Sequence, residues 1–177
     1  MLIQIGPPKD PSDVVDLLLE CHERIRSFVA LAIRLGNAEN PSADEIRDAA
    51  ARVIRYFAEA LPLHVADEEE SILPRLSGRE RDLDRALADV HREHSEHEPL
   101  LEALLRTCRD LHDSPEKLAE LRQSLETTAS TLQRDFLQHL DAEEKVVLPA
   151  IRQFLTLEEQ AAILRELRAR RSGLHVH

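Results

Sequence analysis

Residues 64–74 read HVADEEESILP, and residues 139–149 read HLDAEEKVVLP. Both stretches follow one pattern: His, three residues, Glu-Glu, three residues, Leu-Pro. Every shared letter is offset by 75 residues, which indicates a duplicated structural unit. In each copy a Glu stands four residues after a His, and on an α-helix two such side chains lie on one face, one turn apart. The repeat therefore predicts two helices that carry matched His–Glu pairs.

The sequence around the repeat shows helical periodicity almost throughout. Apolar residues recur every three or four positions in four long segments, and a shorter amphipathic segment follows them. Four long helices joined by short loops pack as an up-and-down four-helix bundle. We therefore expect an all-α fold and a single domain over residues 1–177, with the bundle at about residues 12–155 and an additional short C-terminal helix at about residues 157–171. Pro62 lies inside the second helix and is expected to kink it.

The composition agrees with this fold class. The 177-residue chain contains four glycines and is 42% hydrophobic, 3% aromatic and 32% charged, which is typical of a helical globular domain. Lys and Arg number 23 against 34 Asp and Glu, so the formal net charge is −11. We expect no binding to nucleic acid and none to an anionic membrane surface, because both require a basic face.

The cysteines and the N-terminal residues bear on the compartment. Cys21 and Cys108 are too few for a disulfide framework. The first residues lack the charged and the long apolar parts of a signal peptide. No apolar run approaches the roughly 18 residues of a membrane span. We therefore expect a cytoplasmic protein.

The His–Glu pairs fall on the apolar stripes of their helices, where Leu61 and Ile72 are in register with His64 and Glu68. Burying such groups without partners costs several kcal/mol, so something must compensate them. Core-facing positions on the other two helices hold one more His each. The candidate metal ligands are therefore His22, His64, Glu68, His94, His139 and Glu143. Imidazole and carboxylate ligands suit iron, manganese or zinc, and two glutamates able to bridge suit a two-metal site in a bundle core.

Several neighbours of these residues have roles that the spacing leaves open. Glu69 and Glu144 each follow a candidate ligand. We expect them to bond a histidine N–H or to face solvent, although either could swing into the site. The spacing also leaves open whether a further ligand lies near His94, and the candidates are His91, His97 and Glu98.

With these residues the sequence resembles the hemerythrin-like HHE cation-binding family over about residues 12–155. The doubled His–Glu–Leu-Pro pattern is the most recognisable part. Glu93-His94 followed by Leu100-Leu101 resembles the family's third-helix pattern. The resemblance implies a four-helix bundle with two non-haem iron ions, bridged by two carboxylates and an oxo or hydroxo group. It implies Glu68 and Glu143 as bridging ligands, and as terminal ligands His22, His64, His94 and His139.

The chain departs from the oxygen-carrying members of that family. Those members have a fifth histidine, from a His-x3-His pair on the third helix, whereas Val90 and Glu98 stand four residues on either side of His94. Their fourth-helix carboxylate lies five residues after its His, a position held here by Glu144, while Glu143 lies at four. The four-His, two-Glu set resembles more closely the iron–sulfur-repair branch, which is associated with nitrosative stress and iron delivery. The resemblance implies binding or sensing of O₂ or NO, or handling of labile iron.

Two other classes of function stay open. A di-iron redox enzyme, such as a peroxide reductase, could use a similar centre. Ferritin-type carboxylate proteins are less well supported, because they use Glu-x-x-His and no histidine here has a Glu three residues before it. The third class is a metal-free helical interaction module. Its C-terminal helix, with Leu157, Leu164 and Leu167, could dock on the bundle or form a homodimer.

Overall fold

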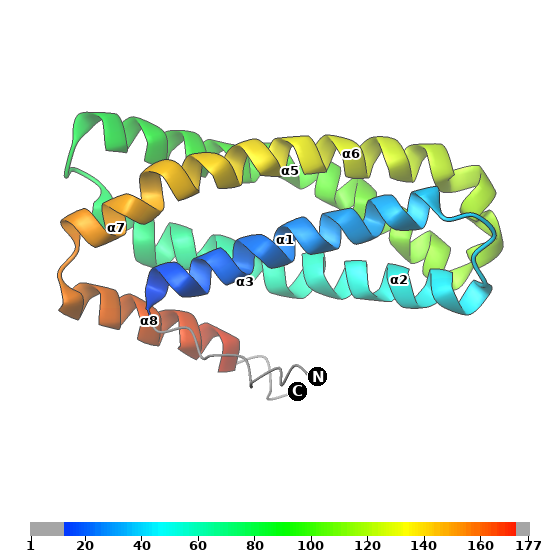
Figure 1. Cartoon of the computed structure of the whole chain (residues 1–177), viewed down its shortest axis with the longest axis horizontal. Coiled ribbons are helices and arrows are strands. Elements are labelled where there is room, and N and C mark those ends of the chain that lie inside the picture. Colours follow the sequence, from blue (N-terminus) through cyan, green and yellow to red (C-terminus); the bar gives the residue numbers. More distant parts are fainter. Residues whose placement is uncertain (1–12, 173–177) are drawn as a thin grey trace, which may run out of the picture.

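The computed structural model describes residues 13–172, and nearly all of this stretch is helical (Figure 1). The first helix is α1 (Val14–Asn37). The next long segment consists of α2 (Ala43–Arg55), η1 (Tyr56–Ala60), α3 (Leu61–Ala66), η2 (Asp67–Ile72) and α4 (Leu73–Leu76). After it come α5 (Arg81–Asp113), η3 (Pro115–Lys117), α6 (Leu118–Ala142), η4 (Glu143–Val147), α7 (Leu148–Phe154) and α8 (Leu157–Ser172). Residues 13–172 contain no β-strand, so the all-α prediction is confirmed.

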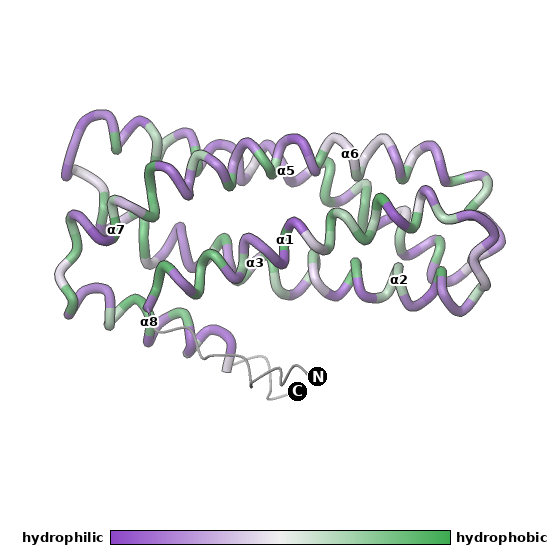
Figure 2. The backbone as a smooth tube through the Cα atoms, viewed as in Figure 1, coloured by the Kyte–Doolittle hydropathy of each residue, from purple (hydrophilic) through white to green (hydrophobic). Residues whose placement is uncertain are grey.

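Within residues 13–172, the segments α1, α2–α4, α5 and α6–α7 lie side by side along the length of the molecule (Figure 1). Helix α1 packs against α2 and α6, and α5 packs against the same two helices. Hydrophobic and hydrophilic residues alternate along each of these segments, as expected of amphipathic helices (Figure 2). No helix within residues 13–172 is long and apolar enough to cross a membrane.

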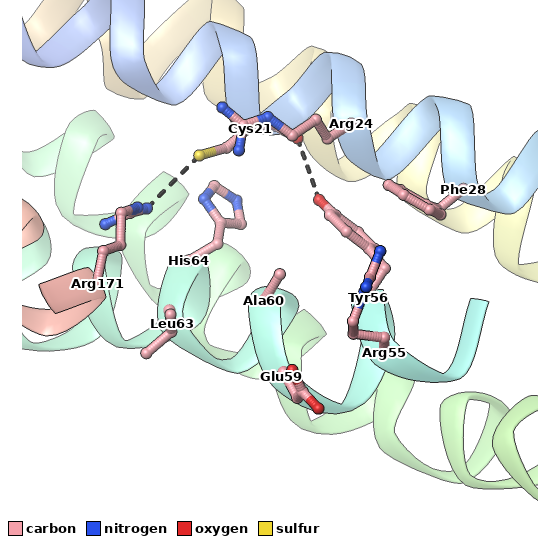
Figure 3. A pocket seen from close by; sticks show the side chains of 10 residues that line it. All are labelled: Cys21, Arg24, Phe28, Arg55, Tyr56, Glu59, Ala60, Leu63, His64 and Arg171. Carbon is pink, nitrogen blue, oxygen red and sulfur yellow. Dashed lines mark hydrogen bonds between the residues drawn. The ribbon is translucent and has the colours of Figure 1, made fainter. Parts of the chain in front are cut away.

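The C-terminal helix α8 docks on its own chain. It packs against α1 and η2, where its apolar residues Ile163 and Leu167 are completely buried. The carboxylate of Asp67 in η2 is also completely buried and accepts hydrogen bonds from Arg170 Nη1 at 3.0 Å and from Arg171 Nη2 at 2.6 Å. Arg171 also reaches the Sγ of Cys21 on α1, at 3.6 Å (Figure 3). Two arginines therefore join α8 to the π-turn that contains Glu68.

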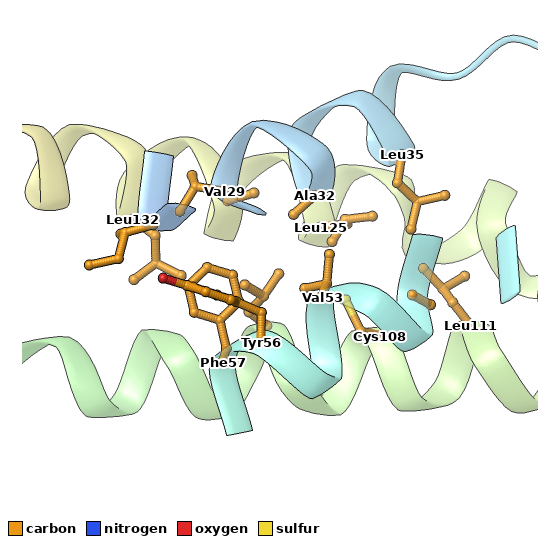
Figure 4. Close-up of a cluster of buried hydrophobic side chains, with 14 of the residues drawn as sticks. Val29, Ala32, Leu35, Val53, Tyr56, Phe57, Cys108, Leu111, Leu125 and Leu132 are labelled. Atoms are coloured by element: carbon orange, nitrogen blue, oxygen red, sulfur yellow. The ribbon is translucent and has the colours of Figure 1, made fainter. Parts of the chain in front are cut away.

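Two separate clusters of buried apolar side chains fill the space between the helices. The first cluster lies around Val29, Phe57, Leu111 and Leu132 (Figure 4). The second cluster lies at the end where α8 docks, and its members include Leu18, Ile72, Val90, Val147 and Ile163. Each fully buried Leu or Ile stabilises the fold by about 1.5–3 kcal/mol relative to an exposed one. The clusters hold the helices on either side of a layer that neither of them fills.

Within the described residues, three π-helical turns interrupt the helices, and a Leu-Pro pair follows each one. The leucine donates its backbone N–H to a carbonyl five residues earlier: Leu61 to Tyr56, Leu73 to Glu68 and Leu148 to Glu143. A proline has no N–H to donate and its ring conflicts with the carbonyl four residues before it. The disturbance expected at Pro62 therefore takes the form of a π-turn, and the two Leu-Pro pairs of the repeat make the same turn at Glu68 and Glu143.

The buried Asp67 carboxylate provides a first test of the fold. We predict that Asp67→Asn lowers the free energy of unfolding by about 2 kcal/mol, because two arginines lose a charged partner that is shielded from water. Burial raises the pKa of Asp67, and the charges of Arg171 and Arg170 oppose that rise. The measurement is urea unfolding of metal-free protein, followed by circular dichroism.

Glu70→Gln is the matched control, because Glu70 also contacts Arg170, at 3.0 Å, but its side chain is 66% exposed. We expect that variant to change stability by less than about 0.5 kcal/mol. Equal effects of the two substitutions would show that burial of Asp67 contributes nothing to the docking of α8.

Candidate metal centre

The six candidate ligands of the sequence analysis meet in the layer between the two apolar clusters. On α1, for example, Leu18 of the second cluster and Ile25 of the first lie on either side of His22. Five of the six side chains are at most 4% exposed, and His94 is 9% exposed. The elements supply them as follows: α1 His22, α3 His64, η2 Glu68, α5 His94, α6 His139 and η4 Glu143.

The ligand atoms of these residues form two groups, each able to hold one metal ion. One group is His22, His64, Glu68 and Glu143, and the other is Glu68, His94, His139 and Glu143. Within each group the ligand atoms lie within 4.8 Å of one another. Both carboxylates belong to both groups, so the arrangement offers two adjacent cation positions that share Glu68 and Glu143.

Each carboxylate faces one histidine of each group. Glu143 places Oε2 3.2 Å from His22 Nε2 and Oε1 3.0 Å from His139 Nε2. Glu68 places Oε1 3.4 Å from His64 Nε2 and Oε2 3.1 Å from His94 Nε2. Because the two oxygens of one carboxylate point to different groups, each glutamate has the geometry of a bridging ligand.

Most of these inward atoms have no hydrogen-bond partner among residues 13–172. The buried atoms without one include His22 Nε2, His64 Nε2, Glu68 Oε2, His94 Nε2, Glu143 Oε1 and Glu143 Oε2. A buried polar group left unpaired costs about 1–3 kcal/mol, and a charged one costs more. Lone pairs of nitrogen and oxygen that converge without hydrogen bonds fit a cation, and this donor set suits iron, manganese or zinc.

The electrostatics of the metal-free layer show the same need for positive charge. Burial, together with the negative charge of Glu143, raises the pKa of Glu68 well above its usual value. Burial also acts to raise the pKa of Glu143, but contacts with His139 and His22 outweigh it and hold that pKa low. Burial lowers the pKa of His64 to about 3. Without a cation, the layer thus favours a proton on Glu68 and a neutral His64.

Carboxylates on the outer side orient three of the four histidines. His22 Nδ1 donates to Glu144 Oε1 at 2.9 Å, and Arg26 donates to the same oxygen at 2.8 Å. His94 Nδ1 donates to Glu69 Oε1 at 2.7 Å. A proton held on Nδ1 leaves the Nε2 lone pair directed inward. Glu69 and Glu144 therefore lie outside both ligand groups, as the sequence analysis favoured.

The third outer carboxylate was not predicted in this role. Glu93 Oε2 accepts from His139 Nδ1 at 2.7 Å, from a different helix. Glu93 stands next to His94, so the two adjacent residues serve two different histidines. The adjacency is visible in the sequence, but the choice of His139 as partner depends on how α5 and α6 are rotated against each other.

The remaining residues near His94 lie outside both groups. His97 is buried and packs edge-on against His139, with ring centroids 5.2 Å apart, and against Phe136 at 4.8 Å. His91 is exposed and donates to Glu69 Oε2 at 2.7 Å. Glu98 is exposed. In this geometry His97 borders the centre, and neither His91 nor Glu98 does.

The fold and the site together define a helical protein whose core offers histidine and glutamate side chains to cations. The family model of the hemerythrin HHE cation binding domain matches residues 13–151, which is more than half of the chain. The chain therefore belongs to the hemerythrin HHE family, and the metal implied by that family, with this His/Glu cluster, is iron. Comparison with curated proteins gave no match.

The outer carboxylates lead to a prediction about metal affinity. Glu144→Gln should weaken metal binding by about 10–100-fold, because His22 loses the charged partner that fixes its ring and raises its basicity. The number of ions bound at saturation should not change. The measurement is competition for Zn²⁺ or Fe²⁺ against a chromogenic chelator.

Glu23→Gln is the matched control, because Glu23 also contacts Arg26, at 2.8 Å, but is 74% exposed and does not contact His22. We expect less than about a twofold change in affinity for this variant. A lower saturating stoichiometry in Glu144→Gln would contradict the outer placement and make Glu144 a ligand.

Proposed function

We propose that this chain is a cytoplasmic, single-domain di-iron protein with an up-and-down four-helix bundle, and that its centre binds O₂ or NO. The observation that carries the proposal is the pair of adjacent ligand groups that share Glu68 and Glu143. Two imidazoles and two shared carboxylates per ion leave coordination positions free for a diatomic molecule. Burial of Cys21 and Cys108 as free thiols agrees with a reducing compartment.

The residues of the chain would have the following roles in the metal centre. Glu68 and Glu143 would bridge the two cation positions. His22 and His64 would hold the ion at one position, and His94 and His139 the ion at the other. The bound iron pair supplies reversible redox and coordination chemistry. Glu69, Glu93 and Glu144 keep three of the imidazoles in the required tautomer.

A small cavity beside the centre supports a diatomic ligand. Its volume is about 30 Å³, and it is lined by His64, His94, His139 and His97 together with the apolar residues Ile25, Leu61, Val65, Leu101 and Phe136. This space accommodates a molecule of about the size of water. A larger organic substrate does not fit there, so the cavity favours gas binding over oxidation of such a substrate.

Burial of the ligands bears on the iron-handling alternative. His22 is 0% exposed, Glu143 1% and Glu68 2%. An ion held by these side chains leaves only when the helices separate locally, which is slow compared with release from a surface site. The geometry therefore favours a retained centre over a carrier of labile iron.

The first test is metal content. Protein reconstituted anaerobically with Fe²⁺ is expected to hold about two irons per chain and, after oxidation, to show ligand-to-metal charge-transfer absorption. Glu68→Ala should lose most of that iron, because one side chain is shared by both positions. Glu98→Ala, which alters an exposed Glu of α5, should retain it. Full iron content with an unchanged spectrum in Glu68→Ala would refute the bridging role.

The second test is the response to gases. Reduced, iron-loaded protein should bind about one O₂ or NO per chain, and Leu101→Phe should weaken that binding about tenfold or more by filling the cavity. Leu105→Phe is the matched control, because Leu105 lies one turn along α5 and does not line the cavity. Both variants should keep the iron content of the parent protein.

The outcomes separate the functional alternatives. No spectral response to either gas, with full iron content, would refute gas binding. Repeated turnover of hydrogen peroxide with an added reductant would instead support the redox-enzyme alternative. Absence of metal after reconstitution would favour the metal-free interaction module.

A further inference from the structure

One histidine of the proposed centre differs from the other three. His22, His94 and His139 donate Nδ1–H to carboxylates of the chain at 2.7–2.9 Å. His64 is equally buried, at 3% exposure, yet its Nδ1 has no hydrogen-bond partner among residues 13–172. The outer carboxylate that the other imidazoles receive is therefore missing, within the described chain, at His64 alone.

His64 lines the wall of a cavity that opens to the surface. The cavity has a volume of about 390 Å³, which is within the range of small-molecule sites. It lies between α1, the η1–α3 segment and α8, and Figure 3 shows His64 beside Cys21 on the side of Arg171. The polar side chains that line it are Cys21, Arg24, Arg55, Tyr56, Glu59, His64 and Arg171.

The lining of this cavity is positively charged, although the whole chain carries a net charge of −11. Arg24, Arg55 and Arg171 contribute three guanidinium groups. Arg171 has a buried carboxylate partner, Asp67, whereas the partner of Arg24, Glu20 at 3.5 Å, is exposed. The one acidic residue of the lining, Glu59, is exposed, and its side chain points away from His64 (Figure 3).

The other polar groups of the lining do not supply negative charge. Burial raises the pKa of the Cys21 thiol, although Arg171 partly opposes that rise. Burial also raises the pKa of the Tyr56 phenol, whose hydroxyl donates to the Cys21 carbonyl at 3.4 Å. Both groups therefore remain neutral. The cavity combines an unpartnered imidazole N–H with guanidinium groups, which is the donor set that recognises an oxyanion.

We propose that this cavity, named here the arginine pocket, binds a small oxyanion, such as the carboxylate of a small organic acid or inorganic phosphate. The anion pairs with Arg24 and Arg55. After a small shift of the side chains that bury His64 Nδ1, it also accepts the Nδ1–H of His64. The proposal rests on the proposed function in one respect: His64 directs Nε2 to a cation and so keeps its proton on Nδ1. A bound anion then supplies the outer partner that Glu144, Glu69 and Glu93 supply elsewhere, and it adjusts the basicity of His64 from outside the centre.

The arginine pocket depends on a helix outside the family match. Arg171 belongs to α8, whereas the match ends at residue 151. Its guanidinium is held against the pocket by Asp67 and by Cys21 Sγ. The pocket therefore includes a residue outside the part of the chain that the family model matches.

The test uses zinc-loaded full-length protein, because zinc is diamagnetic, with ¹⁵N-labelled histidine. Sodium acetate and sodium phosphate are titrated in separate arms at constant ionic strength, with sodium chloride as the control salt. We expect one of the oxyanions to shift the His64 Nδ1–H resonance saturably, with a Kd of about 1 mM or tighter. The double variant Arg24→Gln/Arg55→Gln should weaken binding about tenfold or more.

Arg52→Gln is the matched control variant, since Arg52 lies one turn before Arg55 on α2, is 52% exposed and does not line the pocket. It should change the Kd by less than about twofold. The arm that saturates at lower concentration identifies the source as carboxylate or phosphate. No saturable shift in either arm, an equal response to chloride, or an equal loss in Arg52→Gln would overturn the proposal.

Failure of this inference is distinguishable from failure of the proposed function. A protein that takes up zinc but shows no saturable oxyanion shift overturns the arginine pocket alone. A protein that takes up no zinc counts against the metal centre. In that case the titration of metal-free protein, followed by the amide resonances of Cys21 and Tyr56, still decides whether the pocket binds an oxyanion.

Discussion

The burial of two carboxylates and four imidazoles between two apolar clusters is the constraint on which the rest of this structure depends. Glu68 and Glu143 are at most 2% exposed and share one layer. An ionised carboxylate in such surroundings costs several kcal/mol unless positive charge lies beside it. Without metal, a raised pKa on Glu68 gives partial relief by favouring a proton there. In the proposed centre, two cations would relieve both carboxylates and take up the inward lone pairs, which would couple metal binding to folding.

The backbone around these carboxylates follows from the Leu-Pro pairs that close the repeat. In both copies the carbonyl of the Glu shared by the two ligand groups accepts the i→i−5 bond from the leucine that precedes the proline. The same element therefore forms the π-turn and carries the carboxylate, which gives the two helices matching geometry. Leu61-Pro62 makes a third π-turn without a His–Glu pair. The Leu-Pro pair therefore accounts for the π-turn, and the His–Glu spacing accounts for the pair of candidate ligands. Turns of this type are frequent at functional sites.

Sequence periodicity predicted the six candidate ligands because each one falls on the apolar stripe of its helical segment, and such positions follow from spacing alone. The side-chain contacts between helices were harder to predict from the sequence. Glu93 serves His139, 46 residues away, and Asp67 serves Arg170, 103 residues away. Those pairings depend on the rotation of one helix against another, and the apolar periodicity of a single helix does not specify that rotation. The π-turns that precede Pro74 and Pro149 were not predicted either, because the apolar spacing does not distinguish a π-turn from a continuous α-helix.

The C-terminal helix shows how a segment outside the family match bears on the centre. Asp67 and Glu68 are consecutive residues of η2, one facing the arginines of α8 and the other facing the histidines. The position of that one turn is thus determined from two sides. Because coupling free energies are reciprocal, any interaction that orders η2 from the α8 side also stabilises the placement of Glu68. The same helix contributes Arg171 to the lining of the arginine pocket beside His64. Helix α8 therefore contacts the surroundings of the centre in two ways, through the hydrogen bonds to Asp67 and through the lining of the pocket.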